Sequence, residues 1–184
     1  MDVVLLAPPA HVRSMRHLLY YHITWTTQNR ERQIDAGLAG FLCRYLRAVA
    51  HQERARVLEI GMVATHVHVL LRAHPMTDLS RLVQRSKGGS AALAGKERHS
   101  TSGTRLKWSK GYSIVTLGPR SLEKTRHYLR SQSERHPQEA IPDWRGDSPQ
   151  YEPGGEEEWI GPERMRIRGT GREARLKPRL GIVC

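Results

Sequence analysis

The sequence predicts an α+β domain in which helices cover one face of an antiparallel sheet. Short runs rich in apolar, aromatic and β-branched residues, which are typical of strands, alternate with longer segments whose apolar residues recur every three or four positions, as in helices. Two of the strand-like runs, residues 56–63 and 66–72, are separated only by Ala64 and Thr65. A connection this short can join antiparallel strands but not parallel ones.

The first half of the chain begins with a predicted strand at residues 17–26, where aromatic and β-branched residues dominate. A polar, basic turn follows at residues 28–32. A helix is predicted next, because apolar residues from Leu38 to Val49 recur at helical spacing. The two strands around Ala64 and Thr65 complete this half.

The second half opens with a helix predicted over residues 77–94 and starting at Thr77. A polar loop at 99–103 precedes a strand at 112–117, which Gly118-Pro119 closes. Ser121 is predicted to cap a last helix, which bears Tyr128 and ends near residue 135. The order β-α-β-β-α-β-α is typical of a ferredoxin-like or RRM-like sheet, to which the tyrosine-bearing helix is a C-terminal addition. This plan supports many activities and does not by itself indicate one.

The composition changes after Pro137. Residues 137–163 are rich in Pro and Gly and contain an acidic run, and residues 164–179 are strongly basic. We therefore predict one domain over residues 14–138 and an irregular tail over residues 139–184. The basic end of this tail is either a nucleic-acid-binding arm or a solvated segment.

The charge of the chain indicates a polyanionic partner. Lys and Arg number 30 against 18 acidic residues, which gives a formal net charge of +12 and a pI near 10.4. Nucleic acid is the partner that such a charge favours most, and a membrane surface is the next. A basic surface that only keeps the protein soluble is the alternative.

The remaining composition excludes several classes of protein. Cys43 and Cys184 lie far apart, which excludes a cysteine zinc site and argues against a secreted disulfide framework. No apolar run approaches the ~18 residues that cross a bilayer. Pro8 and Pro9 interrupt the apolar N-terminal stretch, so we do not expect a signal peptide. A cytoplasmic protein without a membrane anchor is expected.

Three sequence features carry candidate chemistry. The first is the pair His66 and His68 in the strand 66–72. Side chains two residues apart in a strand project from the same face, so both imidazoles can reach one metal ion. Because the chain has 10 histidines, such a pair also arises by chance.

The second feature is Tyr128 with Gln132, four residues apart on the last predicted helix. This spacing places both on one helix face, where they can present a phenolic nucleophile and a third metal ligand. A tyrosine packed on the core beside a solvated glutamine is the alternative. The third feature is the basic, aromatic segment 107–112, where rings can stack on bases and ammonium groups can contact phosphates. The candidate DNA-binding residues are Arg105, Lys107, Trp108, Lys110 and, on the preceding helix, Lys87.

Taken in order, these motifs resemble a known family, the single-tyrosine HUH transposases of small insertion sequences that move as single-stranded DNA (the IS200-like transposases). The resemblance covers about residues 16–136. It includes the segments Trp25-Thr26-Thr27, His66-Val67-His68-Val69-Leu70-Leu71, Lys87-Gly88-Gly89-Ser90, Trp108-Ser109-Lys110-Gly111-Tyr112, Thr116-Leu117-Gly118 and Tyr128-Leu129-Arg130-Ser131-Gln132.

The resemblance implies an enzyme that cleaves and rejoins single-stranded DNA at hairpin-bearing element ends. Tyr128 would be the nucleophile and form a 5′-phosphotyrosine, and His66, His68 and Gln132 would hold one divalent metal, Mg²⁺ or Mn²⁺, although histidine ligands keep zinc open. It also implies a homodimer whose composite sites combine the histidines of one subunit with the tyrosine helix of the other.

One position departs from the family pattern. The family usually has Asp directly before the first histidine, and this chain has Thr65. Because such a residue influences how the histidine is oriented, a relative that binds nucleic-acid hairpins without cleaving them is the first alternative. A metal-dependent nuclease that hydrolyses DNA without a covalent adduct is the second. A rolling-circle or relaxase enzyme is disfavoured, because no helix carries paired tyrosines.

Overall fold

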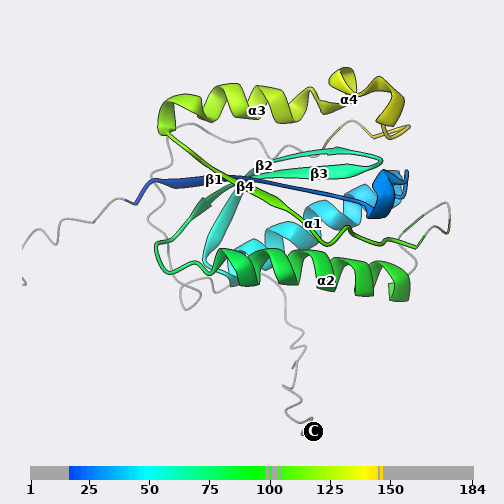
Figure 1. Cartoon of the computed structure of the whole chain (residues 1–184), viewed down its shortest axis with the longest axis horizontal. Helices are drawn as coiled ribbons and strands as arrows, with labels where there is room; N and C mark the ends of the chain where they lie inside the picture. The colour runs from blue at the N-terminus through cyan, green and yellow to red at the C-terminus, as the bar shows by residue number, and fades with distance from the viewer. Residues whose placement is uncertain (1–16, 98–99, 101–102, 104, 145, 147–184) are drawn as a thin grey trace, which may run out of the picture. The chain divides into compact units, whose positions relative to one another are not determined.

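The computed structural model describes residues 17–97, 100, 103, 105–144 and 146, which all belong to one compact unit. Its centre is an antiparallel sheet of β1 (Leu19–Thr26), β2 (Ala55–Val63), β3 (His66–Ala73) and β4 (Ser113–Leu117), in the order β2-β3-β1-β4. Helices α1 (Ala36–Gln52) and α2 (Leu79–Glu97) lie on one side of this sheet, and α3 (Leu122–Arg130) and α4 (Gln132–Arg135) lie on the other (Figure 1). The predicted α+β fold is confirmed.

The main core lies between the sheet and the pair α1 and α2. Alternate residues of the central strands point into it, among them Ile23 and Trp25 of β1 and Val67 of β3, all at most 2% exposed. Helix α1 supplies Leu38, Leu42 and Leu46 to the same cluster, and the Asp35 carboxylate caps this helix by accepting from the Leu38 amide at 2.9 Å.

The opposite face of the sheet has a different chemistry. Residues of the other parity, including His22 on β1 and His66 and His68 on β3, point toward α3 and α4. The apolar contacts there are few and centre on Leu58, Leu70 and Leu129. The sheet therefore presents polar side chains at one end of this face, and a small hydrophobic cluster holds α3 over them.

The edge strand β2 contains a bulge beneath α3. Val57 pairs with Leu71 and Glu59 with Leu70, so Leu58 is an extra residue in this strand. Leu58 joins the small hydrophobic cluster, while the buried Glu59 carboxylate accepts hydrogen bonds from the Arg130 guanidinium at 2.9–3.0 Å. The bulge thus gives β2 both an apolar and an ionic contact with α3.

One predicted helix start is displaced and another is confirmed. Helix α2 is capped by Asp78, whose carboxylate accepts from the Arg81 amide at 2.9 Å, and the Thr77 hydroxyl instead donates to the Arg54 carbonyl. Ser121 is the N-cap residue of α3, as predicted, although its side chain makes no capping bond; it ends a short 3₁₀-helix, η2 (Pro119–Ser121), that leads directly into α3.

The last predicted helix is also divided in two at Ser131. Its backbone there is non-helical, with φ −87° and ψ 17°. The Ser131 hydroxyl and the Gln132 side-chain amide both donate to the Tyr128 carbonyl, at 3.3 and 3.0 Å. These side-chain donors occupy an acceptor that a continuous helix would give to a backbone amide, and the helix ends. Tyr128 consequently lies in the last turn of α3, and Gln132 opens α4.

The chain remains folded against the domain beyond residue 138, where the sequence placed its end. A 3₁₀-helix, η3 (Pro137–Glu139), follows α4, and Ile141 then enters the main core at 5% exposure. The tail from residue 147 on, and most of the loop predicted at 99–103, lie outside the described residues. None of the helices in the described part of the chain is both long and apolar enough to cross a membrane.

Candidate active site

Four side chains from three separate segments meet on the α3 face of the sheet. The rings of His66 and His68 have centroids 5.0 Å apart, and both residues are buried. The Tyr128 ring stands edge-on to His68 with a centroid distance of 5.6 Å, and His22 of β1 stacks on His68 at 5.0 Å. The structure therefore brings the predicted nucleophile next to the predicted histidine pair within one chain.

Gln132 reaches the same place because β2 has a glycine there. Gly61 is the partner of His68 in the β2–β3 ladder. A Cβ at Gly61 would lie 2.5 Å from the Leu129 carbonyl oxygen, closer than real Cβ atoms come to a neighbour, and a tight 3.0 Å from Cγ of Gln132. The missing side chain lets the junction of α3 and α4 rest on the strand, and Gln132, only 1% exposed, is placed beside the histidines.

Two buried polar atoms at this junction have no partner among the described residues. His68 Nδ1 is engaged by His22 Nε2 at 2.8 Å and by the Thr24 hydroxyl at 2.9 Å. His68 Nε2 and Gln132 Oε1, in contrast, are both buried and make no hydrogen bond with any residue that the structure describes. An unsatisfied buried polar atom costs about 1–3 kcal/mol, so a ligand that both atoms could bind would stabilise the folded state.

His66 is held in place by contacts to its Nδ1 atom. Its Nδ1 lies 2.9 Å from the Thr65 hydroxyl and 3.3 Å from Oε2 of Glu139. The Thr65 hydroxyl in turn donates to the same carboxylate oxygen at 2.8 Å. The His136 ring also stands edge-on to the His66 ring, with a centroid distance of 5.1 Å.

The electrostatics keep both imidazoles neutral. Burial is the main cause that lowers the pKa of His68 to about 3, and the neighbouring His66 and His22 act in the same direction. Burial also lowers the pKa of His66, although Glu139 opposes it. A neutral imidazole has a free lone pair on one nitrogen, which is the state that binds a metal ion.

The residues fit a metal ion only if the glutamine takes part. In the described part of the chain, no three His, Cys, Asp or Glu side chains are arranged to hold a metal. A site here would combine His66 and His68 with the orphaned amide oxygen of Gln132, the set predicted from the sequence. Two nitrogens and one neutral oxygen leave room for phosphate oxygens in the coordination shell of a divalent ion.

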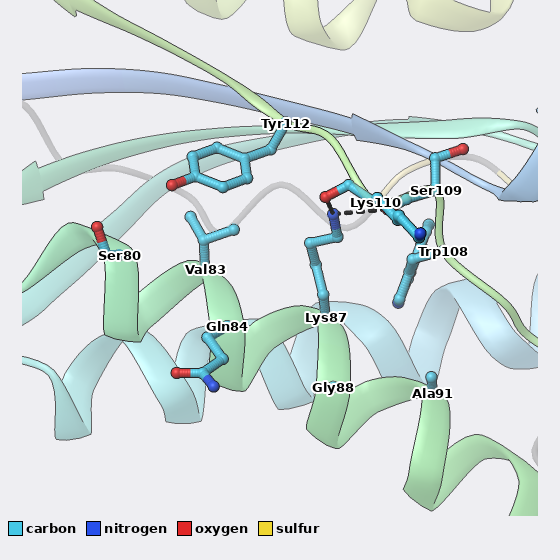
Figure 2. A pocket seen from close by; sticks show the side chains of 10 residues that line it. All are labelled: Ser80, Val83, Gln84, Lys87, Gly88, Ala91, Trp108, Ser109, Lys110 and Tyr112. Atoms are coloured by element: carbon cyan, nitrogen blue, oxygen red, sulfur yellow. Dashed lines mark hydrogen bonds between the residues drawn. The ribbon is translucent and has the colours of Figure 1, made fainter.

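The predicted DNA-binding residues lie elsewhere. Figure 2 shows Lys87 of α2 reaching toward the backbone that precedes β4, where its ammonium donates to the carbonyls of Ser109, Lys110 and Gly111 at 2.7–3.1 Å. The Trp108 indole N–H donates to the Ser90 hydroxyl at 2.9 Å. Both residues line a groove of about 460 Å³ on the α2 side of the sheet. Arg105, Lys107 and Lys110 are exposed.

Sequence reasoning missed several residues of the site. His22 and Thr24 have the parity of β1 residues that face α3, but only the pairing of Thr24 with His68 identifies them as its neighbours. The guanidinium of Arg135 lies 5.1 Å from the Tyr128 ring centroid. The sequence did not predict this contact, because it depends on the helix break between the two residues. Glu139 fell in the predicted tail, and the sequence contains no signal that would have placed it beside His66.

Comparison with known proteins identifies the family. The profile described as "Transposase IS200 like" matches residues 15–132, well over half of the chain. The chain belongs to the IS200-like transposases. The matched segment begins before β1 and ends at Gln132, so it contains the histidine pair and Tyr128, whereas Glu139 lies beyond it.

Individual relatives agree with this assignment. The chain is 27% identical over 127 residues to the ISDra2 transposase TnpA of Deinococcus radiodurans, covering 67% of this chain and 90% of that protein. A crystal structure assigned as a transposase from Deinococcus radiodurans matches 67% of this chain and 98% of its own, with 24% identity and a TM-score of 0.50. The REP-associated tyrosine transposase bound to a REP hairpin matches 77% of this chain and 95% of its own, with 12% identity and a TM-score of 0.52. The two structures show that the fold is shared.

Proposed function

We propose that this IS200-like transposase cleaves and rejoins single-stranded DNA at hairpin-bearing element ends, with Tyr128 as the nucleophile. The observation that carries the proposal is the position of the Tyr128 ring, 5.6 Å from His68, whose Nε2 is buried without a partner among the described residues. His66, His68 and Gln132 would hold one divalent metal ion, either Mg²⁺ or Mn²⁺.

Attack of Tyr128 on the phosphate is slow without assistance, because a phenol with a pKa of ~10 is mostly protonated at neutral pH and the scissile phosphate is itself an anion. A bound divalent ion acts as a Lewis acid on the phosphate oxygens. Arg135, whose guanidinium lies over the Tyr128 ring, adds positive charge where the phenolate forms. The oxygen of Tyr128 attacks phosphorus and loses its proton to solvent, the P–O3′ bond breaks, and the leaving 3′ oxygen takes up a proton.

The products explain why the reaction can be reversed. The step leaves a 5′-phosphotyrosine and a free 3′-OH, and the number of phosphoester bonds is unchanged. A second 3′-OH can therefore attack the same phosphorus and release Tyr128 without ATP. A hydrolytic nuclease would use water as the nucleophile and would not need a tyrosine at this position.

The proposed substrate follows from charge and from one relative. A net charge of +12 favours a polyanion, and a structural relative that shares the fold is bound to a REP hairpin. Exposed Arg105, Lys107 and Lys110 are the proposed phosphate contacts of this chain. A cytoplasmic location is proposed with this function.

A homodimer with composite sites is proposed as well. In the single chain Tyr128 stands over its own histidines, and its helix rests on its own Gly61. In a two-fold symmetric dimer both chains offer the same docking surface for α3, so an exchange of α3 between the chains would create two equivalent sites.

One experiment separates this proposal from the alternatives. The protein is mixed with end-labelled single-stranded hairpin DNA and Mn²⁺, and the products are separated on a denaturing gel. A covalent protein–DNA adduct is expected. Cleaved DNA without an adduct would identify a hydrolytic nuclease, and bound but intact DNA would identify a binding protein. Either result contradicts the proposed transesterification.

A further inference from the structure

Thr65 directly precedes His66, and a carboxylate from a distant part of the chain lies beside both residues. Glu139 Oε2 lies 3.3 Å from His66 Nδ1 and accepts a hydrogen bond from the Thr65 hydroxyl at 2.8 Å. The carboxylate comes from the opposite end of the domain, 73 residues later in the chain. It lies outside the segment that matches the family profile, which ends at residue 132.

The hydrogen bonds among these three residues determine the tautomer of His66. A carboxylate only accepts hydrogen bonds, so the single proton of the Thr65 hydroxyl is directed to Glu139. The hydroxyl oxygen then has only lone pairs to offer His66 Nδ1, which lies 2.9 Å away. Nδ1 must therefore carry the proton and donate it, and Nε2 is left with its lone pair free.

Glu139 is itself fixed in place. The Ala64 amide donates to the Glu139 carbonyl at 2.7 Å, which ties η3 to the residue next to Thr65. Arg30 donates to both carboxylate oxygens at 3.2–3.3 Å, and Arg32 donates to the carbonyls of Gln138 and Ala140. The basic turn between β1 and α1 thus holds the backbone and the carboxylate of this segment against β3.

We propose that Glu139, acting through Thr65, is a positioning residue that favours the Nδ1–H tautomer of His66 and so leaves Nε2 free to bind the metal. This inference rests on the proposed metal site of His66, His68 and Gln132. In proteins a metal-bound histidine commonly donates its other N–H to a carboxylate or carbonyl, and loss of that partner weakens metal affinity roughly 10–100-fold. Here the Thr65 hydroxyl lies between His66 and the carboxylate, which comes from η3.

The first test is the tautomer of His66 in the metal-free protein. Long-range ¹H–¹⁵N correlation spectra should show His66 protonated on Nδ1 in the wild type and a mixture of tautomers in Glu139→Ala. The double variant Thr65→Asp/Glu139→Ala should regain the Nδ1–H form, because an aspartate next to His66 can accept that proton directly. An unchanged tautomer in Glu139→Ala overturns the proposal.

Two matched variants distinguish the hydrogen bond of Glu139 from its charge and from its anchoring of η3. Glu134→Gln removes the same charge from an exposed position on α4 and should leave the His66 signals unchanged. Arg30→Ala removes an ion pair that anchors η3 but keeps the carboxylate, and it should retain the Nδ1–H form. Loss of that form in Glu134→Gln would show that net charge rather than the hydrogen bond of Glu139 sets the tautomer, which also overturns the proposal.

The second test is Mn²⁺ affinity, measured by isothermal titration calorimetry. Glu139→Ala should bind Mn²⁺ roughly 10–100-fold more weakly than the wild type, and Thr65→Asp/Glu139→Ala should recover most of that loss. If Glu139→Ala fails to fold, Glu139→Met, which keeps the length of the side chain but has no oxygen to accept the Thr65 hydroxyl proton, takes its place: a weakened affinity supports the proposal and an unchanged affinity overturns it.

His66→Ala serves as the reference variant that distinguishes a failure of the proposed metal site from a failure of the positioning role of Glu139. If His66→Ala binds Mn²⁺ as tightly as the wild type, the metal site of the proposed function is wrong, whatever Glu139 does to the tautomer. If His66→Ala loses affinity while Glu139→Ala keeps both affinity and tautomer, the metal site stands and the positioning role of Glu139 is wrong.

Discussion

Gly61 and His68 lie directly opposite each other in the β2–β3 ladder, and the junction of α3 and α4 rests on the glycine rather than on the histidine. The tyrosine-bearing helix thus approaches the sheet closely beside His68, one of the two histidines of the site. The distance between Tyr128 and His68 depends on a residue that has no side chain.

We predict that Gly61→Ala displaces this junction and abolishes adduct formation. The added Cβ would meet a backbone carbonyl at 2.5 Å, which cannot move without moving α3. Overpacking of this kind costs about 1–3 kcal/mol, so the melting temperature should fall while the main core stays folded. Gly95→Ala on α2, where nothing lies within 4 Å of the new Cβ, is the control and should be neutral or stabilising. Full activity of Gly61→Ala would show that the junction of α3 and α4 does not have to rest on residue 61.

We predict that Mn²⁺ raises the melting temperature of the DNA-free protein and that His68→Ala removes this effect. The orphaned His68 Nε2 and Gln132 Oε1 would gain a partner in the folded state only. Ligand at 100 times its Kd stabilises a folded protein by about 2.7 kcal/mol. Differential scanning calorimetry with Mn²⁺ and with EDTA measures the difference, and exposed His51→Ala should respond like the wild type. An equal Mn²⁺ shift in His68→Ala would place the ion elsewhere.

We predict that Tyr128→Phe forms no adduct but still binds hairpin DNA. The substitution removes the nucleophilic oxygen and retains the ring that packs between His22, His68 and Arg135. Adduct formation is read on denaturing gels and binding by fluorescence anisotropy. If the adduct persists, another residue is the nucleophile, and the exposed Tyr112 is the first to replace.

We predict that DNA affinity falls steeply with salt and that the two lysines of the α2 groove differ in their contribution. Each phosphate contact to single-stranded DNA contributes about −0.7 to the slope of log K against log salt. Lys110→Ala should reduce the slope by about that amount, because Lys110 is exposed. Lys87→Met should change it less and lower the melting temperature, since all three Lys87 protons are bound to carbonyls. Equal slope changes would show that Lys87 also contacts phosphate.

We predict that mixing inactive Tyr128→Phe and His66→Ala proteins restores adduct formation. If the tyrosine helix docks on the partner, a heterodimer contains one site in which both residues are intact, and random exchange makes about half of the dimers heterodimers. Persistent inactivity, with subunit exchange confirmed by mass spectrometry, would show that each chain uses its own helix, as in the single chain.

The sequence predicted the strands and helices well where periodicity decides them. The shared face of His66 and His68 in β3 follows from strand alternation alone, whereas their burial depends on α3 and α4 covering that face. The break at Ser131 did not follow, because it depends on two side chains competing for the Tyr128 carbonyl, which spacing does not reveal. Lys87 was predicted to contact DNA from its charge, but its bonds depend on a backbone segment far away in the sequence. Glu139 could not be placed without the tertiary fold.

The anchoring of Ile141 in the main core has a mechanical consequence for the helices that precede it. Because the chain is fixed at β4 before them and at Ile141 after them, α3 and α4 form an arch attached at both ends rather than a free arm. The connections are residues 118–121 and 136–140, and fully extended they span at most roughly 14 and 18 Å. If the arch crosses to a second chain while both attachments hold, the two sheets must lie within those lengths of each other. Lengthening either connection with glycine would then relax a geometric constraint on how the two copies assemble.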